Sequence, residues 1–430
     1  MHPREGWTED RRPELLTRRG FLRQGAAAGL VLGGGSSLLA ACSSSAKPGT
    51  PTGTQTLTSG GIPLPRPNNP VTWPLYQDNP AIANGLPPET NATLRLYNWV
   101  AYINPDCLKA FGKKYNCKVE VTTFENMDVA LAKLRSGQNL GFDVFFPTVD
   151  VMGELVYGKL IQPLNHSYIP NITQAWPDFT SPFYDQGWQY TVPYTIYTTG
   201  ISWRKDLVPE NPYAMRNPWH QMLWQPKYKG KIAILDDYRE GISLGLMRNG
   251  LANLNTTDRG QIALSRRSLQ DLSSLVNARI DNNDYTEVPT GQTWIHHSWS
   301  GDMAAAAYYM PKGVPVETVG YWFPTDGRGP VANDTNTVLR TATNPVLAHL
   351  FLNYMLDLPN VLENISFNGY MQPLTEVTPQ RLIKEKLLPK SLTSTVVLPS
   401  YFRRGLGELQ LPVDADALWQ QAWLVASNGL

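Results

Sequence analysis

The sequence lacks most of the features that mark catalytic, metal-binding or nucleic-acid-binding proteins. Its 430 residues include three cysteines and six scattered histidines, and the formal net charge is +1. A net charge so close to zero gives no electrostatic reason to expect nucleic acid as a partner. No cysteine pair has zinc-ligand spacing, and the adjacent His296 and His297 would face opposite sides of a strand, which keeps them from sharing a metal ion.

Several catalytic motifs are missing as well. There is no H-E-x-x-H pair, no phosphate-binding P-loop and no G-x-G-x-x-G after a strand. No pattern indicates an activated nucleophile or a bound cofactor. We therefore expect a protein that is not an enzyme, uses no cofactor or metal, and does not bind nucleic acid.

What the sequence has is a distinctive N-terminus. Residues 17–24, TRRGFLRQ, place Arg18 and Arg19 before an apolar, glycine-rich stretch that ends at Cys42. That stretch is too short for a good membrane span and too glycine-rich for a stable helix, but it suits the core of a signal peptide. It resembles a twin-arginine export signal, and LAAC at 39–42 resembles a lipobox. The resemblance implies that residues 1–41 are removed and that Cys42 is lipidated.

These signals predict an exported protein, periplasmic or at the cell surface, that a lipid anchors to the outer face of the cytoplasmic membrane. Residues 42–90 follow with Ser, Thr, Gly and Lys and then ten prolines, with little periodicity. We expect this composition to bury too little apolar surface to fold. The segment should therefore be a flexible tether between the lipid and the folded part.

The remaining chain alternates between strands and helices. Strands are predicted at 92–100, 117–124 and 142–148, with helices at 105–115 and 126–138 between them. A second alternation begins near Val192. This order is typical of an α/β fold with mostly parallel sheets.

Cys107 and Cys117 lie on either side of a predicted helix, each at an apolar-looking position. In an exported protein they are allowed to form a disulfide. Two buried thiols fit the same pattern, because a helix between them works against a bridge. The sequence leaves both arrangements open.

The acidic turn at 236–240 also has two interpretations. Asp237 and Glu240 are three residues apart, which is the spacing of a helix N-cap and the N3 position of a capping box. Carboxylates at the carboxyl end of a strand also occupy the usual ligand crevice of α/β folds, where they are able to receive a cation. The two roles are compatible.

Five longer segments follow one another over most of the folded chain: LRLYNWVAYINPDCLKAFGKKYNCKVEV, LAKLRSGQNLGFDVFFPT, VPYTIYTTGISW, NPWHQMLWQPKYKGKIAILDDYRE and NPVLAHLFLNYMLDLPNVLENISFNGYMQP. In this order they resemble the bacterial spermidine/putrescine-binding proteins, which are solute-binding subunits of ABC importers. The resemblance implies a two-lobed, periplasmic-binding-protein-like α/β fold of type II with a hinge of two crossovers. It places residues 91–193 and 334–380 in lobe 1 and residues 194–333 and 381–430 in lobe 2. It also implies a monomer that delivers a polyamine to the permease subunits of the importer.

In that family an aliphatic polyamine lies between the lobes, with acids on its ammonium groups and aromatic rings on its methylenes. Asp237 and Glu240 match the amine-binding acids, and Trp99 and Tyr102 match one aromatic wall. Carried over position by position, the resemblance implies ten ligand-binding residues: Trp99, Tyr102, Thr148, Asp150, Asp237, Glu240, Trp299, Asp334, Tyr370 and Gln410.

Two positions depart from the family pattern. Asp150 stands where the family usually has an aromatic residue, and Ala332 stands where it typically has a tryptophan. The extra carboxylate and the missing ring leave the solute open, with an amino-acid derivative, a sugar or a metal as alternatives to a polyamine. An exported enzyme is a third alternative, because twin-arginine signals often serve cofactor-bearing proteins, although no cofactor motif supports it.

Overall fold

The computed structural model describes residues 58–136 and 140–428. The predicted signal segment and Cys42 lie outside the described residues. Within the described ranges, no helix combines the length and the apolar character needed to cross a membrane.

Strands and helices alternate along the chain, and several of the strands are only two or three residues long. The strands are β1 (Thr58–Ser59), β2 (Ile62–Pro63), β3 (Thr93–Trp99), β4 (Lys118–Phe124), β5 (Val144–Phe145), β6 (Val192–Arg204), β7 (Ile232–Ile234), β8 (Arg279–Ile280), β9 (Ile295–Trp299), β10 (Val319–Trp322), β11 (Pro330–Val338) and β12 (Leu406–Gly407). The α-helices are α2 (Pro105–Tyr115), α3 (Met127–Arg135), α4 (Met152–Tyr157), α5 (Pro218–Leu223), α6 (Tyr238–Arg248), α7 (Arg259–Val276), α8 (Asp284–Thr290), α9 (Ser300–Ala304), α10 (Ala306–Tyr309), α11 (Pro345–Tyr354), α12 (Leu358–Asn368), α13 (Pro379–Lys384), α14 (Pro399–Arg404) and α15 (Val413–Ser427). Short 3-10 helices are η1 (Val149–Val151), η2 (His166–Tyr168), η3 (Pro170–Gln174), η4 (Pro177–Phe179), η5 (Pro212–Ala214), η6 (Pro226–Tyr228), η7 (Val316–Thr318) and η8 (Lys390–Thr395).

Ten strands of the described chain form one mixed sheet in the order β4-β3-β5-β11-β6-β9-β7-β8, with β10 paired to β6 and β12 to β11. At one end β3 runs parallel to β4 and β5, and at the other end β7 runs parallel to β8 and β9. Between these ends β6 and β11 pair antiparallel. The predicted α/β class with parallel strands is confirmed at the two ends of the sheet.

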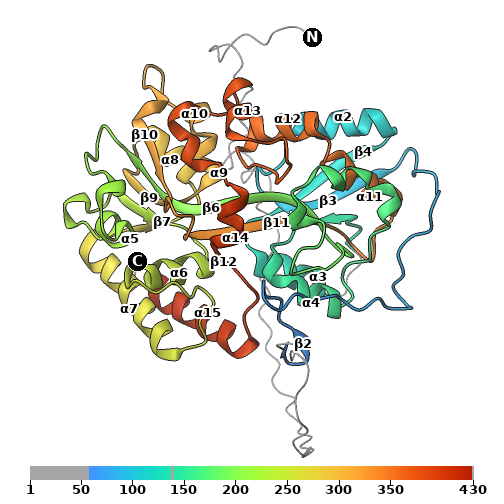
Figure 1. The fold of residues 1–430 in the computed structure, drawn as a ribbon, viewed down its shortest axis with the longest axis horizontal. Coiled ribbons are helices and arrows are strands. Elements are labelled where there is room, and N and C mark those ends of the chain that lie inside the picture. The colour runs from blue at the N-terminus through green and yellow to red at the C-terminus, as the bar shows by residue number, and fades with distance from the viewer. Residues whose placement is uncertain (1–57, 137–139, 429–430) are drawn as a thin grey trace, which may run out of the picture. The chain divides into compact units, whose positions relative to one another are not determined.

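The two central strands connect the ends of the sheet to each other. β11 also pairs with β5, and β6 also pairs with β9 and with β10. Figure 1 shows β6 and β11 running across the middle of the molecule, with β3 and β4 on one side and β7 and β9 on the other. We call the part built on β3, β4 and β5 the first half, and the part built on β7, β8, β9 and β10 the second half.

Local sequence signals determine where helix α2 begins and ends. It begins at Pro105 after Asn104, whose side chain accepts the backbone N–H of Asp106. It ends at Asn116, which adopts the left-handed conformation with φ of 50°. The predicted helix at 105–115 therefore coincides with α2.

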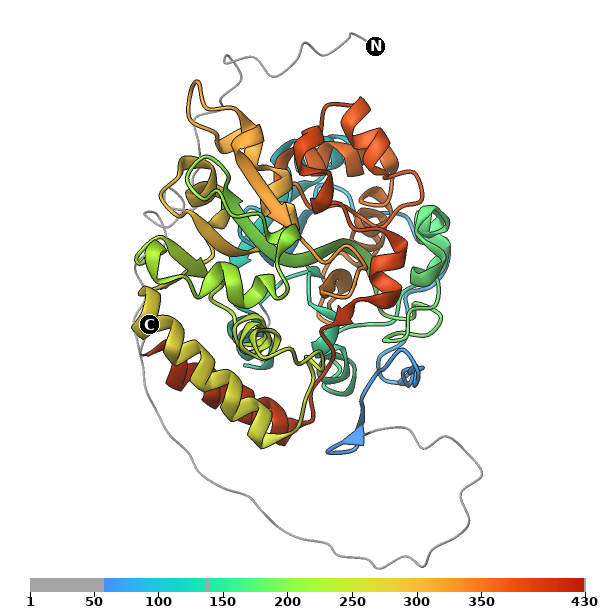
Figure 2. The same cartoon turned by 60° about the vertical axis from the view of Figure 1, so that its left-hand side comes forward.

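Helix α6 packs closely on α7 and α15 through two glycines. A Cβ on Gly241 would lie 2.1 Å from the Trp423 ring of α15, and a Cβ on Gly245 would lie 2.3 Å from the Ser265 hydroxyl of α7. Figure 2 shows α7 and α15 side by side at the edge of the second half. The same glycines form a G-x-S-x-G spacing, but inside a helix and not at a strand-to-helix turn, so no nucleophile elbow results.

Residues 58–90, which we call the N-terminal strap, are packed onto the first half, so the prediction of a flexible tether over residues 42–90 is wrong for residues 58–90. Val71 and Trp73 are 3% and 2% exposed and belong to its apolar core. The Val71 N–H donates to the Phe183 carbonyl at 2.8 Å, and Trp73 Nε1 donates to the Tyr184 carbonyl at 2.7 Å. A few apolar side chains between the prolines pack into the core of the first half. The composition of the segment alone does not indicate these contacts.

Replacing Trp73 with alanine should lower the free energy of unfolding by about 3–5 kcal/mol, because a buried indole and its hydrogen bond are lost. Urea denaturation of the purified protein measures the change. Leu75→Ala is the matched control in the same strap, since Leu75 is 62% exposed and its loss should change stability by less than about 0.5 kcal/mol. Equally small effects of both substitutions would contradict the packed strap.

Candidate functional site

The acidic turn forms the N-terminus of α6. The strand β7 and Leu235 after it are buried, and the chain emerges at Asp236, which is exposed. The Asp237 side chain accepts the backbone N–H groups of Arg239 and Glu240, at 2.8 and 3.1 Å, and so caps the helix. The predicted N-cap is confirmed, whereas the reciprocal bond of a capping box is not formed, because the Glu240 carboxylate turns to other partners.

Glu240 is buried and receives neutral hydrogen-bond donors on one of its two oxygens. Its Oε1 accepts the Thr199 hydroxyl of β6 at 2.7 Å and the Trp299 indole N–H at the end of β9 at 2.8 Å. Burial raises the pKa of Glu240 to about 7, and the nearby charge of Asp237 adds to this effect. Among the described residues, no group donates a hydrogen bond to Oε2.

Asp334 is a second buried carboxylate, in the middle of β11. Its Oδ2 accepts the Tyr102 hydroxyl at 2.7 Å, and its Oδ1 accepts the Tyr197 hydroxyl of β6 at 3.5 Å. Burial raises the pKa of Asp334 to about 7, and the charge of Asp150 adds to this effect. A backbone bridge pairs Asp334 with Thr148, the residue before η1, so the turn that carries Asp150 lies beside it.

Aromatic rings connect the two buried carboxylates. The Tyr197 ring packs edge-on against Trp299, with 6.5 Å between centroids, and against Tyr370, with 5.7 Å. Tyr370 in turn lies edge-on to Tyr102 at 4.9 Å. Because Trp299 and Tyr102 each donate to one of the carboxylates, a continuous aromatic path leads from one acid to the other.

Arg239 is a buried base next to these acids. Its guanidinium donates to the Leu409 carbonyl at 2.9 Å and to Asn255 Oδ1 at 2.7 Å, and it stacks on Trp419 at 4.9 Å. Glu408 directly precedes this carbonyl acceptor. Burial raises the pKa of Glu408 well above its ordinary value, although the Arg239 charge opposes the shift.

Asp150 links the acidic groups of the two halves electrostatically. Together with burial, its charge raises the pKa of Asp237 and Glu408 in the second half as well as that of Asp334. Since Asp150 lies in η1 of the first half, carboxylates of both halves approach one another there. The result is a concentration of negative charge at the junction of the halves, which a bound cation would offset.

Three contact residues on β6 escaped prediction. Thr195 is hydrogen-bonded to Tyr102, and Tyr197 and Thr199 donate to the buried carboxylates. They are two residues apart, so their side chains point to the same face of the strand. The sequence contains a signal for all three, because hydroxyl side chains recur at every second position of this predicted strand.

The side chains of Trp99 and Gln410 contact other residues than the two buried carboxylates. Trp99 Nε1 donates to the Phe146 carbonyl at 3.0 Å, and its ring packs against Phe124. The Gln410 side chain lies against Gly153 of α4. Within the described part of the chain, neither side chain is hydrogen-bonded to Glu240 or Asp334, so a ligand role for either stays a prediction.

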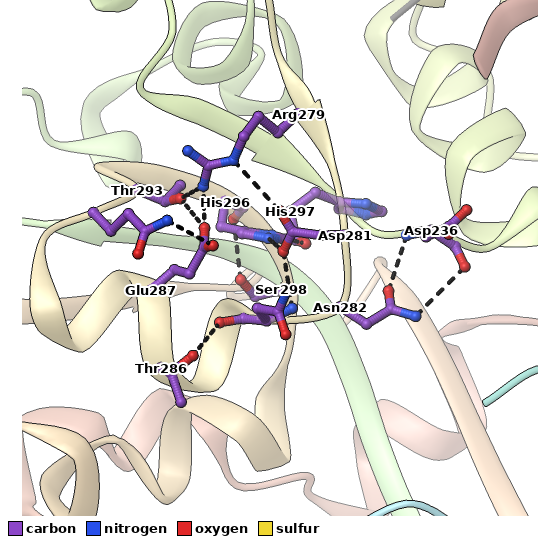
Figure 3. Close-up of polar contacts among 12 residues, drawn as sticks. Asp236, Arg279, Asp281, Asn282, Thr286, Glu287, Thr293, His296, His297 and Ser298 are labelled. Atoms are coloured by element: carbon purple, nitrogen blue, oxygen red, sulfur yellow. Dashed lines mark hydrogen bonds and ion pairs between the residues drawn. The ribbon is translucent and has the colours of Figure 1, made fainter. Parts of the chain in front are cut away.

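A second polar network holds β9, the strand that ends at the site (Figure 3). His296 and His297 are both fully buried. His296 Nε2 lies 3.5 Å from Asp281, which also pairs with Arg279. His297 has no hydrogen bond on either ring nitrogen among the described residues, and its Nε2 lies 3.9 Å from Glu240 Oε2. Burial lowers the pKa of His297 to about 3, so the ring is neutral.

Cys107 and Cys117 are two free thiols, which decides the alternatives that the sequence left open. Cys107 is buried in α2, and burial raises its pKa to about 12. No group of His, Cys, Asp or Glu side chains within residues 58–136 and 140–428 is arranged to hold a metal ion.

Comparison with known proteins assigns the chain to a family. Residues 106–389 match the sequence model of the bacterial extracellular solute-binding proteins. The chain belongs to this family. This solute-binding protein is 28% identical over 305 residues to spermidine/putrescine-binding periplasmic protein 1 of Haemophilus influenzae, covering 70% of this chain and 79% of the relative. It is 26% identical to the spermidine/putrescine-binding periplasmic protein of Escherichia coli, covering 76% and 89%.

Solved structures confirm the fold. A putative spermidine/putrescine ABC transporter protein from Listeria monocytogenes superposes with a TM-score of 0.67 at 26% identity, covering 78% of this chain and 99% of the other. The spermidine/putrescine substrate-binding protein of Streptococcus pneumoniae gives a TM-score of 0.60 at 23% identity, covering 78% and 99%. The solute-binding protein therefore has the predicted periplasmic-binding-protein fold.

Asp334→Asn should stabilise the unliganded protein at pH 8 by on the order of 1–3 kcal/mol and should have little effect at pH 4. The folded-state pKa of about 7 lies above the ordinary value of 3.8. The wild type therefore loses stability as the pH rises from about 4 to 7, because the buried carboxyl group must give up its proton. The amide carries no proton to lose.

Urea denaturation at the two pH values checks this expectation. Glu125→Gln is the control, since Glu125 is exposed and its replacement should show no difference between the two pH values. Equal destabilisation by Asp334→Asn at both pH values would show that the lost hydrogen-bond geometry outweighs the charge.

Proposed function

We propose that this protein is the extracytoplasmic substrate-binding subunit of an ABC importer and that it captures an aliphatic polyamine such as putrescine or spermidine. The observation that carries the proposal is the pair of buried carboxylates, Glu240 and Asp334, joined by a path of aromatic rings. The relatives named for spermidine and putrescine support the same class of solute.

A polyamine requires the two kinds of group that this site contains. A desolvated ammonium needs a carboxylate, and the methylenes between ammonium groups need apolar or aromatic walls. In Glu240, Oε1 is occupied by Thr199 and Trp299, which leaves Oε2 to receive an ammonium. Asp334 stands at the other end of the aromatic path, so one diamine would neutralise both acids.

We further propose that the two halves act as lobes that close on the solute. Lobe 1 would comprise residues 91–193 and 334–380, and lobe 2 residues 194–333 and 381–430. β6 and β11 pass from one half of the sheet to the other, which suits them to be the hinge. Closure would remove the bound ammonium groups from water and strengthen their attraction to the carboxylates.

Titration of the purified protein with putrescine in a calorimeter should give saturable heat, and Glu240→Gln should weaken binding at least about 100-fold. Glutamine keeps an acceptor for Thr199 and Trp299 and removes only the charge. Asp236→Asn, on the exposed residue of the same turn, is the control and should stay within about threefold of the wild type. Absence of heat with every di- and polyamine would rule out this class of solute.

A different small solute in the same fold is the second candidate. Asp150 adds a carboxylate to the junction of the halves, and Ala332 places no ring opposite Tyr197 on the paired strand. Both features change the charge and the walls around the proposed solute. Mass spectrometry of a ligand that copurifies with the protein decides between a polyamine and an amino-acid derivative or a sugar.

We also propose that the protein is exported through its twin-arginine segment, anchored by a lipid on Cys42, and monomeric when it meets its permease. The motifs TRRGFLRQ and LAAC support export and lipidation. Cys42→Ala should move the protein from the membrane fraction to the soluble extracytoplasmic fraction, because its thiol is the predicted attachment point. Cys117→Ala is the control and should leave the protein with the membranes.

A further inference from the structure

The N-terminal strap is fastened to the first half along most of its length. Besides the buried Trp73, Asn79 Nδ2 donates to the Ile161 carbonyl at 2.9 Å, and Asp78 pairs with Lys159 at 2.8 Å. Such contacts, spaced along the strap, fix it to one half of the molecule.

The first residues of the strap, 58–66, contact the second half. The Arg66 guanidinium donates to the Gln410 carbonyl over 2.8 Å. The Val413 N–H, at the start of α15, donates to the Ser59 hydroxyl over 3.0 Å. Figure 2 shows the blue strands at the start of the strap beside the red chain that leads into α15.

The segment around Gln410, to which Arg66 donates, is hydrogen-bonded to the second half. Just before Gln410, the Leu409 N–H donates to Asn255 Oδ1 at 2.9 Å, and the Leu409 carbonyl accepts the buried Arg239. A movement of the second half would therefore carry the Gln410 carbonyl with it.

The strap, α4 and the chain at Gln410 meet at Gly153. A Cβ on Gly153 would lie 2.7 Å from Ile62 Cγ2 and 2.7 Å from Gln410 Oε1. Elements of both halves and the strap therefore pack at one point with no room for a larger residue. The point follows η1, the turn that carries Asp150, so it borders the acidic junction.

We infer that residues 58–66 are a latch that joins the two halves and holds the protein in its closed form. This inference rests on the proposed function, because release of a solute requires the halves to separate. Opening about β6 and β11 would draw Gln410 and Val413 away from α4, and these strap contacts must then break. Both sides of the latch lie outside residues 106–389, so the family model does not describe it.

The double variant Ser59→Ala with Arg66→Ala removes both cross-half hydrogen bonds. It should release putrescine about tenfold faster than the wild type, because the strap contacts that must break before release are already absent. Stopped-flow tryptophan fluorescence, with excess spermidine as the competitor, measures the release. Asp78→Ala is the matched control, because it removes an ion pair of the same strap with the first half only.

A second measurement does not depend on any ligand. Spin labels at Lys109 on α2 and Leu275 on α7, both exposed, report the separation of the halves by pulsed electron resonance in a Cys107→Ser, Cys117→Ser background. The double variant should shift the distance distribution of the unliganded protein to longer values, and Asp78→Ala should not. Gly153→Ala, which wedges the same junction from α4, should act like the double variant.

The outcomes separate the latch from the proposed function. If the wild type binds putrescine and the double variant shows the same release rate and the same distances, the latch is overturned and the solute assignment stands. If the wild type binds no polyamine, the solute assignment fails, and the distance measurement alone decides the latch. If the double variant unfolds at lower temperature, Gly153→Ala decides the question, with unchanged distances counting against the latch.

Discussion

The centre of this protein is governed by two buried carboxylates, Glu240 and Asp334, that make no ion pair with a charged base among the described residues. Glu240 and Asp334 accept hydrogen bonds from hydroxyl and indole groups, which stabilise a carboxylate less than a cation does. The Arg239 guanidinium donates to backbone and amide oxygens and stacks on Trp419, so it makes no hydrogen bond to either carboxylate. The unliganded site is therefore electrostatically incomplete, and this deficit is what selects a cationic solute in the function we propose.

The groups around this deficit lie on the same strands that join the halves. Thr199 and Tyr197 are on β6, and Asp334 is on β11. A solute that draws these side chains together also acts on the strands about which the halves would turn. Recognition and closure are then one event, because the side chains that receive the charge cannot move independently of the hinge.

The parts of this structure that sequence reasoning found are those that local rules determine. Asn104 and Pro105 start a helix and Asp237 caps another, because short side chains near a helix start meet donors only two or three residues away. The order of strands and helices likewise follows from periodicity. The polar partners of Asp334 were within reach in principle, since Tyr197 lies on a strand whose alternation is visible.

What sequence reasoning missed depends on burial and on contacts between distant segments. Arg239 looks like an ordinary surface charge in the sequence, and only the fold buries it between the Leu409 carbonyl and the Trp419 ring of α15. His297 is buried with no hydrogen bond on its ring nitrogens among the described residues, which the sequence does not indicate. The prediction for the strap was wrong for the same reason. Its composition is that of a disordered segment, and it becomes ordered only through contacts such as that of Trp73 with the folded first half.

The packed strap also changes how far the folded part is able to travel. If Cys42 carries the lipid, as proposed, residues 43–57 are all that separate it from β1, and fifteen extended residues span at most about 50 Å. That reach is roughly the diameter of the folded part itself. The folded part would then stay within about one of its own diameters of the membrane and would meet its permease by diffusion in the membrane plane.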